Sequence, residues 1–181
     1  MLDALVVGGM LCTILNNSDY VKIACLTELV DAISPIHTEK DGGVLKYPTF
    51  YPFMHVSNYG RETVIKNLIS CDNFTASKFG ELPVIHSSTT YDEINNELNV
   101  FVVNYDQEND IELKLNLSGF GSLEIMEHQI MNGNDLFATN SFGEPANITP
   151  RLNTVNKSSG KEFTVILPKL SWNVIRFEVN D

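Results

Sequence analysis

The feature that most constrains this chain is a change in its hydrophobic period at Gly60-Arg61. Before this point apolar residues recur at the spacing of helices, whereas after it they alternate with polar residues in short runs typical of strands. A single change of period in a chain of 181 residues favours two structural parts in sequence. We therefore predict a helical part over residues 1–60 and a β-rich part over residues 61–181.

The stretch directly before the change, residues 49–60, is predicted to be a helix. Pro48 suits the first helical position, where its missing N–H would have no partner, and Gly60 suits the left-handed position just after a helix end. This pattern indicates a helix that packs by one side and leads directly into the β-rich part. Four side chains fall on one face at positions i, i+3, i+4 and i+7, namely Phe50, Phe53, Met54 and Ser57.

The first 45 residues have the order of elements found in an α/β barrel. Residues 3–15 are apolar nearly all round, which predicts a buried helix, and Gly8-Gly9 predicts close packing against a neighbour. A second helical run spans residues 23–33, a short buried strand is predicted at residues 35–38, and residues 39–43 form a polar loop. Because a complete barrel needs eight strands and about 250 residues, this region is predicted to be a piece of one.

From Arg61 onward, several short runs predict the strands of an antiparallel sandwich. Residues 98–105 are β-branched and aromatic on both faces, as in a central strand, whereas residues 111–117 alternate and should have one buried face. The connection over residues 132–160 is rich in Asn, Ser, Gly and Pro and is predicted to lie on the surface. The other predicted strands span residues 63–69, 82–87, 123–131, 163–167 and 172–179.

Charge and cysteine content exclude several classes of partner. The net charge is -11 with only 12 Lys and Arg residues, so a basic footprint for nucleic acid or for an anionic membrane surface is missing. Cys12, Cys25 and Cys71 are odd in number and lack CxxC spacing, which favours reduced, buried thiols in a cytoplasmic protein. The apolar run at residues 2–15 lacks a basic leader and is too short to span a bilayer.

Three of the polar residues in the helical part are candidates for chemistry. His37 and Glu39 follow the one predicted barrel strand, where barrel enzymes place their working residues. The alternative is that the pair has no chemical role, with His37 hydrogen-bonded within the fold and Glu39 part of a polar, solvated loop. His55 lies on an aromatic helix face and is predicted to be a packed histidine rather than a base.

The β-rich part offers no complete catalytic or metal site. His86 and His128 lie on separate predicted strands without a partner at ligand spacing, so we predict no metal site. Two carboxylate pairs, Asp92-Glu93 and Glu108 with Asp110, fall in predicted turns. Because glycoside hydrolysis needs two carboxyl groups about 5–9 Å apart across a cleft, neither turn is a convincing acid and nucleophile. We therefore predict no catalytic residue and no cofactor in this chain.

Three stretches together resemble the α-L-arabinofuranosidases of glycoside hydrolase family fifty-one. The similarity runs in order along essentially the whole chain. The stretches are residues 3–11 with 21–26 and Pro35-Ile36, then residues 50–55, and finally Leu167-Pro168 with residues 170–176. Glu127-His128 and residues 138–140 add to the resemblance.

The resemblance implies a retaining hydrolase built from a TIM (β/α)8 barrel and a C-terminal, jelly-roll-like β-sandwich. Residues 1–60 would be the final helices and eighth strand of the incomplete barrel, and residues 61–181 the sandwich. The parent enzyme would remove terminal α-L-arabinofuranosyl residues from arabinose-containing polysaccharides or oligosaccharides, and such enzymes often form homo-oligomers. The two catalytic glutamates of the family would fall before Met1, so the fragment alone is expected to be inactive.

One sugar-binding position of the family should fall within this fragment. The family often has Trp-Arg-Gln-Thr shortly before the Phe-Tyr-Pro-Phe run, and this chain has Leu45-Lys46-Tyr47-Pro48 there. Tyr47 thus aligns with the glutamine that hydrogen-bonds the sugar. It can stack or donate from its hydroxyl but cannot copy an amide, and a purely structural role is the alternative.

Two other functions remain as alternatives, a non-catalytic carbohydrate-binding sandwich and a module for oligomer contacts. A binding module should present a row of exposed aromatic side chains, but the single Trp, Trp172, lies in a strand predicted to face the core. A free sandwich would have no reason to carry residues 1–60. The helices there carry apolar side chains such as Leu5, Val6 and Met10, whose barrel partners would be missing. These side chains must pack on the sandwich, pair with another copy of the chain or stay loose, and we expect pairing with another copy most often.

Overall fold

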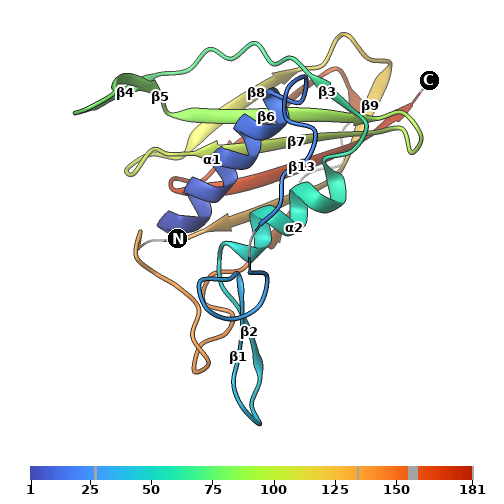
Figure 1. Ribbon diagram of the computed structural model, residues 1–181. Helices are drawn as coiled ribbons and strands as arrows, with labels where there is room; N and C mark the ends of the chain where they lie inside the picture. Colours follow the sequence, from blue (N-terminus) through green and yellow to red (C-terminus); the bar gives the residue numbers. More distant parts are fainter. Residues whose placement is uncertain (27, 134, 155–158, 181) are drawn as a thin grey trace.

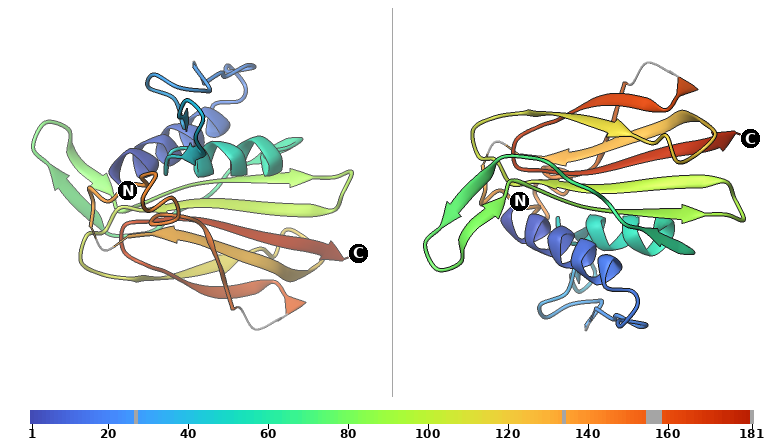
Figure 2. Two further views of the ribbon diagram at one scale, coloured as in Figure 1. Left: turned by 90° about the horizontal axis from the view of Figure 1, so that it is seen from below. Right: turned by 90° about the horizontal axis from the view of Figure 1, so that it is seen from above.

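Two helices cover one face of a large antiparallel sheet, and a two-stranded ribbon covers the other face (Figure 1, Figure 2). The computed structural model describes residues 1–26, 28–133, 135–154 and 159–180. The helices are α1 (Leu2–Asn16) and α2 (Phe50–Tyr59), and the hairpin of β1 (Ile36–Thr38) and β2 (Val44–Lys46) lies between them in sequence. The later strands are β3 (Thr63–Ile65), β4 (Asn73–Ala76), β5 (Gly80–Pro83), β6 (Ile85–Asp92), β7 (Glu97–Asn104), β8 (Ile111–Asn116), β9 (Ser122–Asn132), β10 (Arg151–Asn153), β11 (Ser159–Gly160), β12 (Glu162–Leu167) and β13 (Ser171–Asn180).

The large sheet has the strand order β10-β9-β13-β7-β6-β3, with β11 also paired to β9. All of these pairs are antiparallel. β7 lies between β13 and β6, and every residue from Leu98 to Asn104 is buried, which confirms the prediction of a central strand. The end strands β3 and β10 have only three residues each, which limits the open edge that another chain could pair with.

One hydrophobic core fills the space between the sheet and the ribbon of β8 and β12. β8 alternates between half-buried and exposed positions, as predicted, and pairs with β12 along its whole length. The rings of Phe163 on β12 and Phe177 on β13 lie 4.9 Å apart across this core. Because burying a large apolar side chain contributes about 1.5–3 kcal/mol, the apolar side of the ribbon is enough to hold it against the sheet.

The second core lies between the helices and the opposite face of the sheet. Trp172 on β13 is fully buried there, which confirms that its strand faces the core. A Cβ atom on Gly8 would lie 2.6 Å from the Trp172 ring, and one on Gly9 would lie 2.0 Å from the Tyr105 hydroxyl. The glycine pair therefore lets α1 approach the sheet, as the predicted close packing requires.

The exposure of individual side chains corrects two predictions. Leu5 is only 2% exposed because α1 packs it on the sheet, whereas Val6 and Met10 on the outer side are 50% and 59% exposed. The prediction of a missing partner is therefore wrong for Leu5. The predicted burial of the thiols is wrong for Cys25, which is exposed, and right for Cys12. Within the described residues, neither helix is long and apolar enough to cross a membrane.

The predicted second helix over residues 23–33 is wrong, because the described part of this run contains no helix. Glu28, Asp31 and Ala32 have positive φ angles of 53°, 61° and 51°, which a right-handed helix excludes. The Asp31 carboxylate also accepts hydrogen bonds from the N–H and the hydroxyl of Thr38. A side chain that bonds nearby backbone in this way competes with helix formation.

α2 confirms the helix predicted before Arg61, but its ends and its buried side differ from the prediction. The helix buries Pro52 and His55, whereas the predicted face of Phe50, Phe53, Met54 and Ser57 is half-buried or exposed. Pro48 precedes the N-cap Thr49, and Pro52 lies in the first turn, where a backbone N–H has no intrahelical acceptor. Gly60 has φ -78° and ψ 65°, so it is not left-handed. A larger residue is excluded for another reason, because its Cβ atom would lie 2.6 Å from the Val56 carbonyl oxygen.

The short elements differ most from the sequence-based prediction. The strand predicted at residues 35–38 is present as β1, but it pairs antiparallel with β2 and is one side of a hairpin. β4 and β5 form a second hairpin that the sequence pattern does not predict, and β3 is shorter than the run 63–69. The connection 132–160 carries the short strands β10 and β11.

Candidate functional site

Tyr47 lies at a cavity of about 390 Å³ beside the start of α1. Its backbone N–H donates to the Pro35 carbonyl oxygen, which fixes the residue between the β1–β2 hairpin and α2. Its half-buried side chain lines the cavity together with residues 1–3, 32–34, 48–49 and 136–139. The predicted substrate-binding residue is therefore accessible to a small molecule, and its contact with a sugar stays a prediction.

His37 lies next to Tyr47, with 6.2 Å between the two ring centroids. Its Nδ1 atom is 3.4 Å from the Asp31 carboxylate. The pKa of Asp31 lies below its ordinary value because the backbone N–H and hydroxyl of Thr38 donate to the carboxylate. The Tyr47 ring, the His37 imidazole and the Asp31 carboxylate therefore lie close together. Glu39 is exposed on the turn between β1 and β2.

His55 connects α2 to two strands of the sheet. Its Nδ1 atom accepts a hydrogen bond of 3.1 Å from the indole N–H of Trp172, which can only donate. The imidazole proton is therefore on Nε2, which donates to Gln129 Oε1 at 2.9 Å. Burial lowers the pKa of His55 to about 4. This neutral, doubly bonded imidazole confirms the prediction of a packed histidine.

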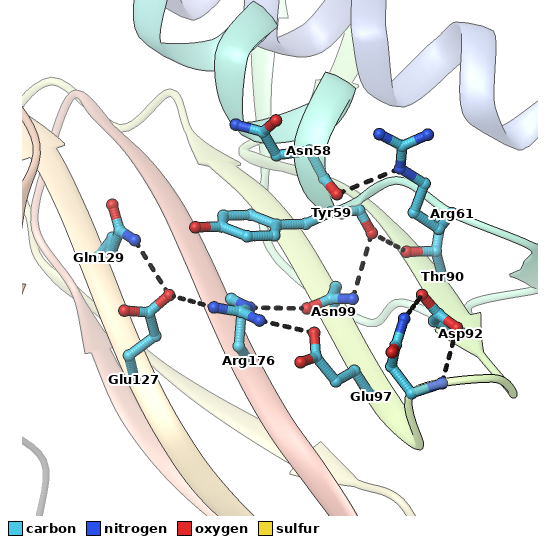
Figure 3. Close-up of polar contacts among 11 residues, drawn as sticks. Asn58, Tyr59, Arg61, Thr90, Asp92, Glu97, Asn99, Glu127, Gln129 and Arg176 are labelled. Atoms are coloured by element: carbon cyan, nitrogen blue, oxygen red, sulfur yellow. Dashed lines mark hydrogen bonds and ion pairs between the residues drawn. The ribbon is translucent and has the colours of Figure 1, made fainter.

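Arg176 on β13 is the centre of a second polar cluster on the same face of the sheet (Figure 3). Its guanidinium donates to Glu97 on β7 at 2.6 Å and to Glu127 on β9 at 2.8 Å. The guanidinium also lies 4.0 Å from the centroid of the Tyr59 ring, at the end of α2. One partly buried cation thus links three strands of the sheet to the second helix.

A second cavity of about 360 Å³ lies beside Arg176, between the end of α2 and the β6–β7 turn. Asp92 and Glu97 are two of the carboxylates that line it. Asp92 accepts from the side chain and backbone of Asn95 and from the backbone of Ile94, which hold its pKa below the ordinary value. Because Asp92 stays ionised and Glu97 is paired with Arg176, the two are poorly suited to share acid and nucleophile roles.

The other carboxylates of the two turns, which were not predicted to be catalytic, make local contacts or lie exposed. Asp110 accepts from the backbone N–H of Lys169 at 2.9 Å, and the backbone N–H of Glu108 donates to Asp106 at 2.8 Å. Glu93 is exposed in the β6–β7 turn. The structure therefore does not bring Asp92-Glu93, or Glu108 with Asp110, into a catalytic arrangement.

The strand histidines are held apart. His128 is buried, with Nε2 3.1 Å from Asn173 Oδ1 and Nδ1 accepting from Asn153 at 3.3 Å. His86 is half-buried on β6, and burial lowers its pKa. Among residues 1–26, 28–133, 135–154 and 159–180, no group of three His, Cys, Asp or Glu side chains could hold a metal ion.

Sequence reasoning missed the cluster of Glu97, Glu127, Gln129 and Arg176. The available signal was Glu127 and Arg176 within two predicted strands, 123–131 and 172–179, and Glu97 directly before a third, 98–105. Charged side chains are rarely buried unless they are paired, so such residues point to one another. The pairing of Arg176 with both Asn99 and Glu127 across the sheet, however, depends on a register that the sequence alone does not specify.

Comparisons with known proteins decide what these features belong to. The sequence model of the family described as "Alpha-L-arabinofuranosidase C-terminal domain" matches residues 1–171. The chain belongs to this family. The resemblance found in the sequence is thereby confirmed.

Several curated relatives of this family carry exo-acting enzyme names. Intracellular exo-α-(1→5)-L-arabinofuranosidase 1 of Bacillus subtilis is 41% identical over 97% of this chain and 35% of its own length. The intracellular exo-α-(1→5)-L-arabinofuranosidase of Acetivibrio thermocellus is 38% identical over 96% of this chain and 35% of its own length. Exo-α-(1→6)-L-arabinofuranosidase of Bifidobacterium longum is 34% identical over 96% of this chain and 34% of its own length. The chain thus spans about a third of the length of the relatives it matches.

Solved structures of the family have the same fold over this region. A family 51 α-L-arabinofuranosidase from Bifidobacterium longum matches with a TM-score of 0.90 and 29% identity, over 98% of this chain and 34% of that chain. The thermostable family 51 α-L-arabinofuranosidase from Thermotoga petrophila matches with a TM-score of 0.81 and 25% identity, over 96% of this chain and 37% of that chain. Mostly antiparallel β structure with two helices is therefore the architecture of the C-terminal domain in this family.

Proposed function

We propose that the chain is the C-terminal part of a retaining α-L-arabinofuranosidase. The parent enzyme removes terminal α-L-arabinofuranosyl residues from arabinose-containing polysaccharides or oligosaccharides. The observation that carries this proposal is the family match over residues 1–171, together with 41% identity to a relative named as an exo-acting arabinofuranosidase. Because the chain spans 35% of that relative, the activity is proposed for a longer protein.

We propose that the two carboxyl groups that a retaining glycosidase needs about 5 Å apart are not supplied by this chain. Asp92 is held by backbone and side-chain donors, and Glu97 and Glu127 are both paired with Arg176. The catalytic glutamates belong, in this proposal, to barrel strands outside the chain. Residues 1–181 alone are therefore expected to be inactive.

Residues 1–60 form, in this proposal, the last part of the catalytic barrel, and residues 61–181 form the C-terminal sandwich. Exposed apolar side chains support an unpaired barrel surface, since Val6 and Met10 on α1 are 50% and 59% exposed and Ile23 and Ile33 are 83% and 93% exposed. Exposed apolar side chains in such number support an interface with another part of the protein or with another copy. We therefore also propose a homo-oligomeric parent enzyme.

Tyr47 is the residue of this chain that we assign to substrate contact. Its position at the cavity beside α1, next to His37, supports the assignment. A phenol ring can stack on a sugar face and donate one hydrogen bond from its hydroxyl. For localisation we propose the cytoplasm, because several relatives are named intracellular.

The test is a chimera in which residues 1–181 replace the matching C-terminal region of the Bacillus subtilis relative. The chimera is expected to release the aryl group from an aryl α-L-arabinofuranoside, whereas purified residues 1–181 are expected to release none. Tyr47→Phe in the chimera should raise KM by about tenfold, the loss of one polar contact of about 1.4 kcal/mol. Activity of the isolated chain that co-purifies with it, or a folded chimera without activity, would contradict the proposal.

A further inference from the structure

A continuous path of side-chain hydrogen bonds crosses the helix-covered face of the sheet. The Trp172 indole donates to His55, and His55 donates to Gln129. Gln129 Nε2 in turn donates to Glu127 Oε1 at 3.0 Å, and the same oxygen accepts from Arg176 at 2.8 Å. Figure 3 shows the part of this path from Gln129 to Arg176. The path binds the middle of α2 to strands β9 and β13.

The end of α2 is bound to the sheet by the same cluster. The Tyr59 carbonyl oxygen accepts hydrogen bonds of 3.1 Å from both Thr90 on β6 and Asn99 on β7. Asn99 Oδ1 accepts from Arg176 Nε at 3.3 Å, and the Tyr59 ring lies over the same guanidinium. Two separate points of α2, one helical turn apart, are thus fixed by polar side chains of the sheet.

The start of α2 leads without a break to the cavity that Tyr47 lines. The Phe50 N–H donates to the Tyr47 carbonyl at 3.0 Å, and the Tyr51 N–H donates to the Pro48 carbonyl at 3.3 Å. Residues 47–51 therefore continue the helix as one hydrogen-bonded turn. From His55 back to Phe50 the helix is only about 7.5 Å long, so a tilt at His55 moves Tyr47 directly.

We propose that Gln129 and Arg176 are positioning residues for the saccharide cavity, which they influence through α2 and Tyr47. This inference rests on the proposed function, because it assumes that Tyr47 contacts the substrate. The sheet then does more than support the helices. Gln129 and Arg176 lie outside the cavity but fix the orientation of Tyr47, which lines it. Displacing a contact residue by about 1 Å can cost about 100-fold in rate.

Gln129→Leu interrupts the path between His55 and Glu127 without replacing any residue of α2 or of the cavity lining. Asn153→Leu is the matched control, because it also replaces an amide beside β9 but acts on the opposite face, where Asn153 donates to His128. In the chimera, Gln129→Leu should lower kcat/KM by about tenfold, the loss expected for Tyr47→Phe, mainly through KM, and Asn153→Leu should leave it within twofold. Arg176→Lys keeps the positive charge but loses the planar guanidinium that donates to both Glu97 and Glu127. This variant should also lower kcat/KM.

A double-mutant cycle separates positioning from general destabilisation. If Gln129 acts through Tyr47, Gln129→Leu should cost less than twofold in a Tyr47→Phe background, whereas independent effects would multiply. Equal losses in both backgrounds would overturn the inference even though the chimera is active. The isolated chain gives a readout that does not depend on activity. Amide hydrogen exchange over residues 47–51 should quicken in Gln129→Leu and not in Asn153→Leu, and unchanged exchange there would also overturn the inference.

Discussion

Lowering the pH from about 7.5 to about 5 is expected to weaken the fold through His55. Its imidazole is 1% exposed and uses both nitrogens, one as donor and one as acceptor. Protonation would place a second N–H on Nδ1, opposite the indole N–H of Trp172. Two donors would then face each other in the core, so the folded state resists the proton that the unfolded chain accepts.

The magnitude follows from the two pKa values of His55, about 4 in the folded protein and the ordinary histidine value of 6.5 in the unfolded chain. A histidine whose folded pKa is lowered contributes stability that is fully present above pH 6.5 and is lost as the pH falls towards 4. A difference of about 2.5 units corresponds to about 3 kcal/mol in total, of which about 2 kcal/mol is lost by pH 5. The lowered pKa values of His86 and His128 act in the same direction.

The assay is urea unfolding at several pH values, followed by the emission of Trp172, the single Trp of the chain, and by far-UV circular dichroism. Wild type should lose at least about 2 kcal/mol of unfolding free energy between pH 7.5 and 5. His55→Gln should be less stable at pH 7.5 but should lose about 2 kcal/mol less over the same interval. The reasoning is refuted if His55→Gln and wild type show the same pH dependence.

Two further predictions concern packing beneath α1. Gly9→Ala should lower the unfolding free energy by about 1–3 kcal/mol, measured as a fall in Tm, because its Cβ atom would lie 2.0 Å from the Tyr105 hydroxyl. Gly119→Ala, where no atom lies within 4 Å of an added Cβ, should change stability by less than about 0.5 kcal/mol. Cys12, whose pKa burial raises to about 12, should resist thiol reagents at pH 8 until the protein unfolds, whereas the exposed Cys25 should react at once. Rapid labelling of Cys12 in folded protein would show that α1 does not stay on the sheet.

Regular elements were predictable where apolar side chains recur with the period of the element. β8 alternates with a period of two, and α2 has apolar residues at helical spacing, so both were located within a few residues. The buried side of α2 was not predictable in this way, because the helix buries Pro52 and His55 rather than the predicted face. The run over residues 23–33 also has helical spacing, but positive φ angles at Glu28, Asp31 and Ala32 prevent a helix. Spacing alone does not reveal such backbone angles, since they depend on contacts such as that of Asp31 with Thr38.

The candidate site was predictable only where a sequence resemblance supplied it. Tyr47 came from its position before the Phe-Tyr-Pro-Phe run, and the structure places it at a cavity. The path from Trp172 to Arg176 was not predictable, because it joins residues up to 117 positions apart in the chain. Its geometry depends on the register of three strands and on the position of α2 above them.

The placement of β13 has a consequence for the synthesis of the protein. This strand lies between β7 and β9, although it comes after all the other strands in the sequence. A growing chain therefore holds two separate groups of strands, β3-β6-β7 and β9-β10-β11, which share no ladder until β13 has been made. Open strand edges pair readily with other chains. On the ribosome, aggregation of the two unjoined half-sheets competes with folding until β13 emerges and joins them.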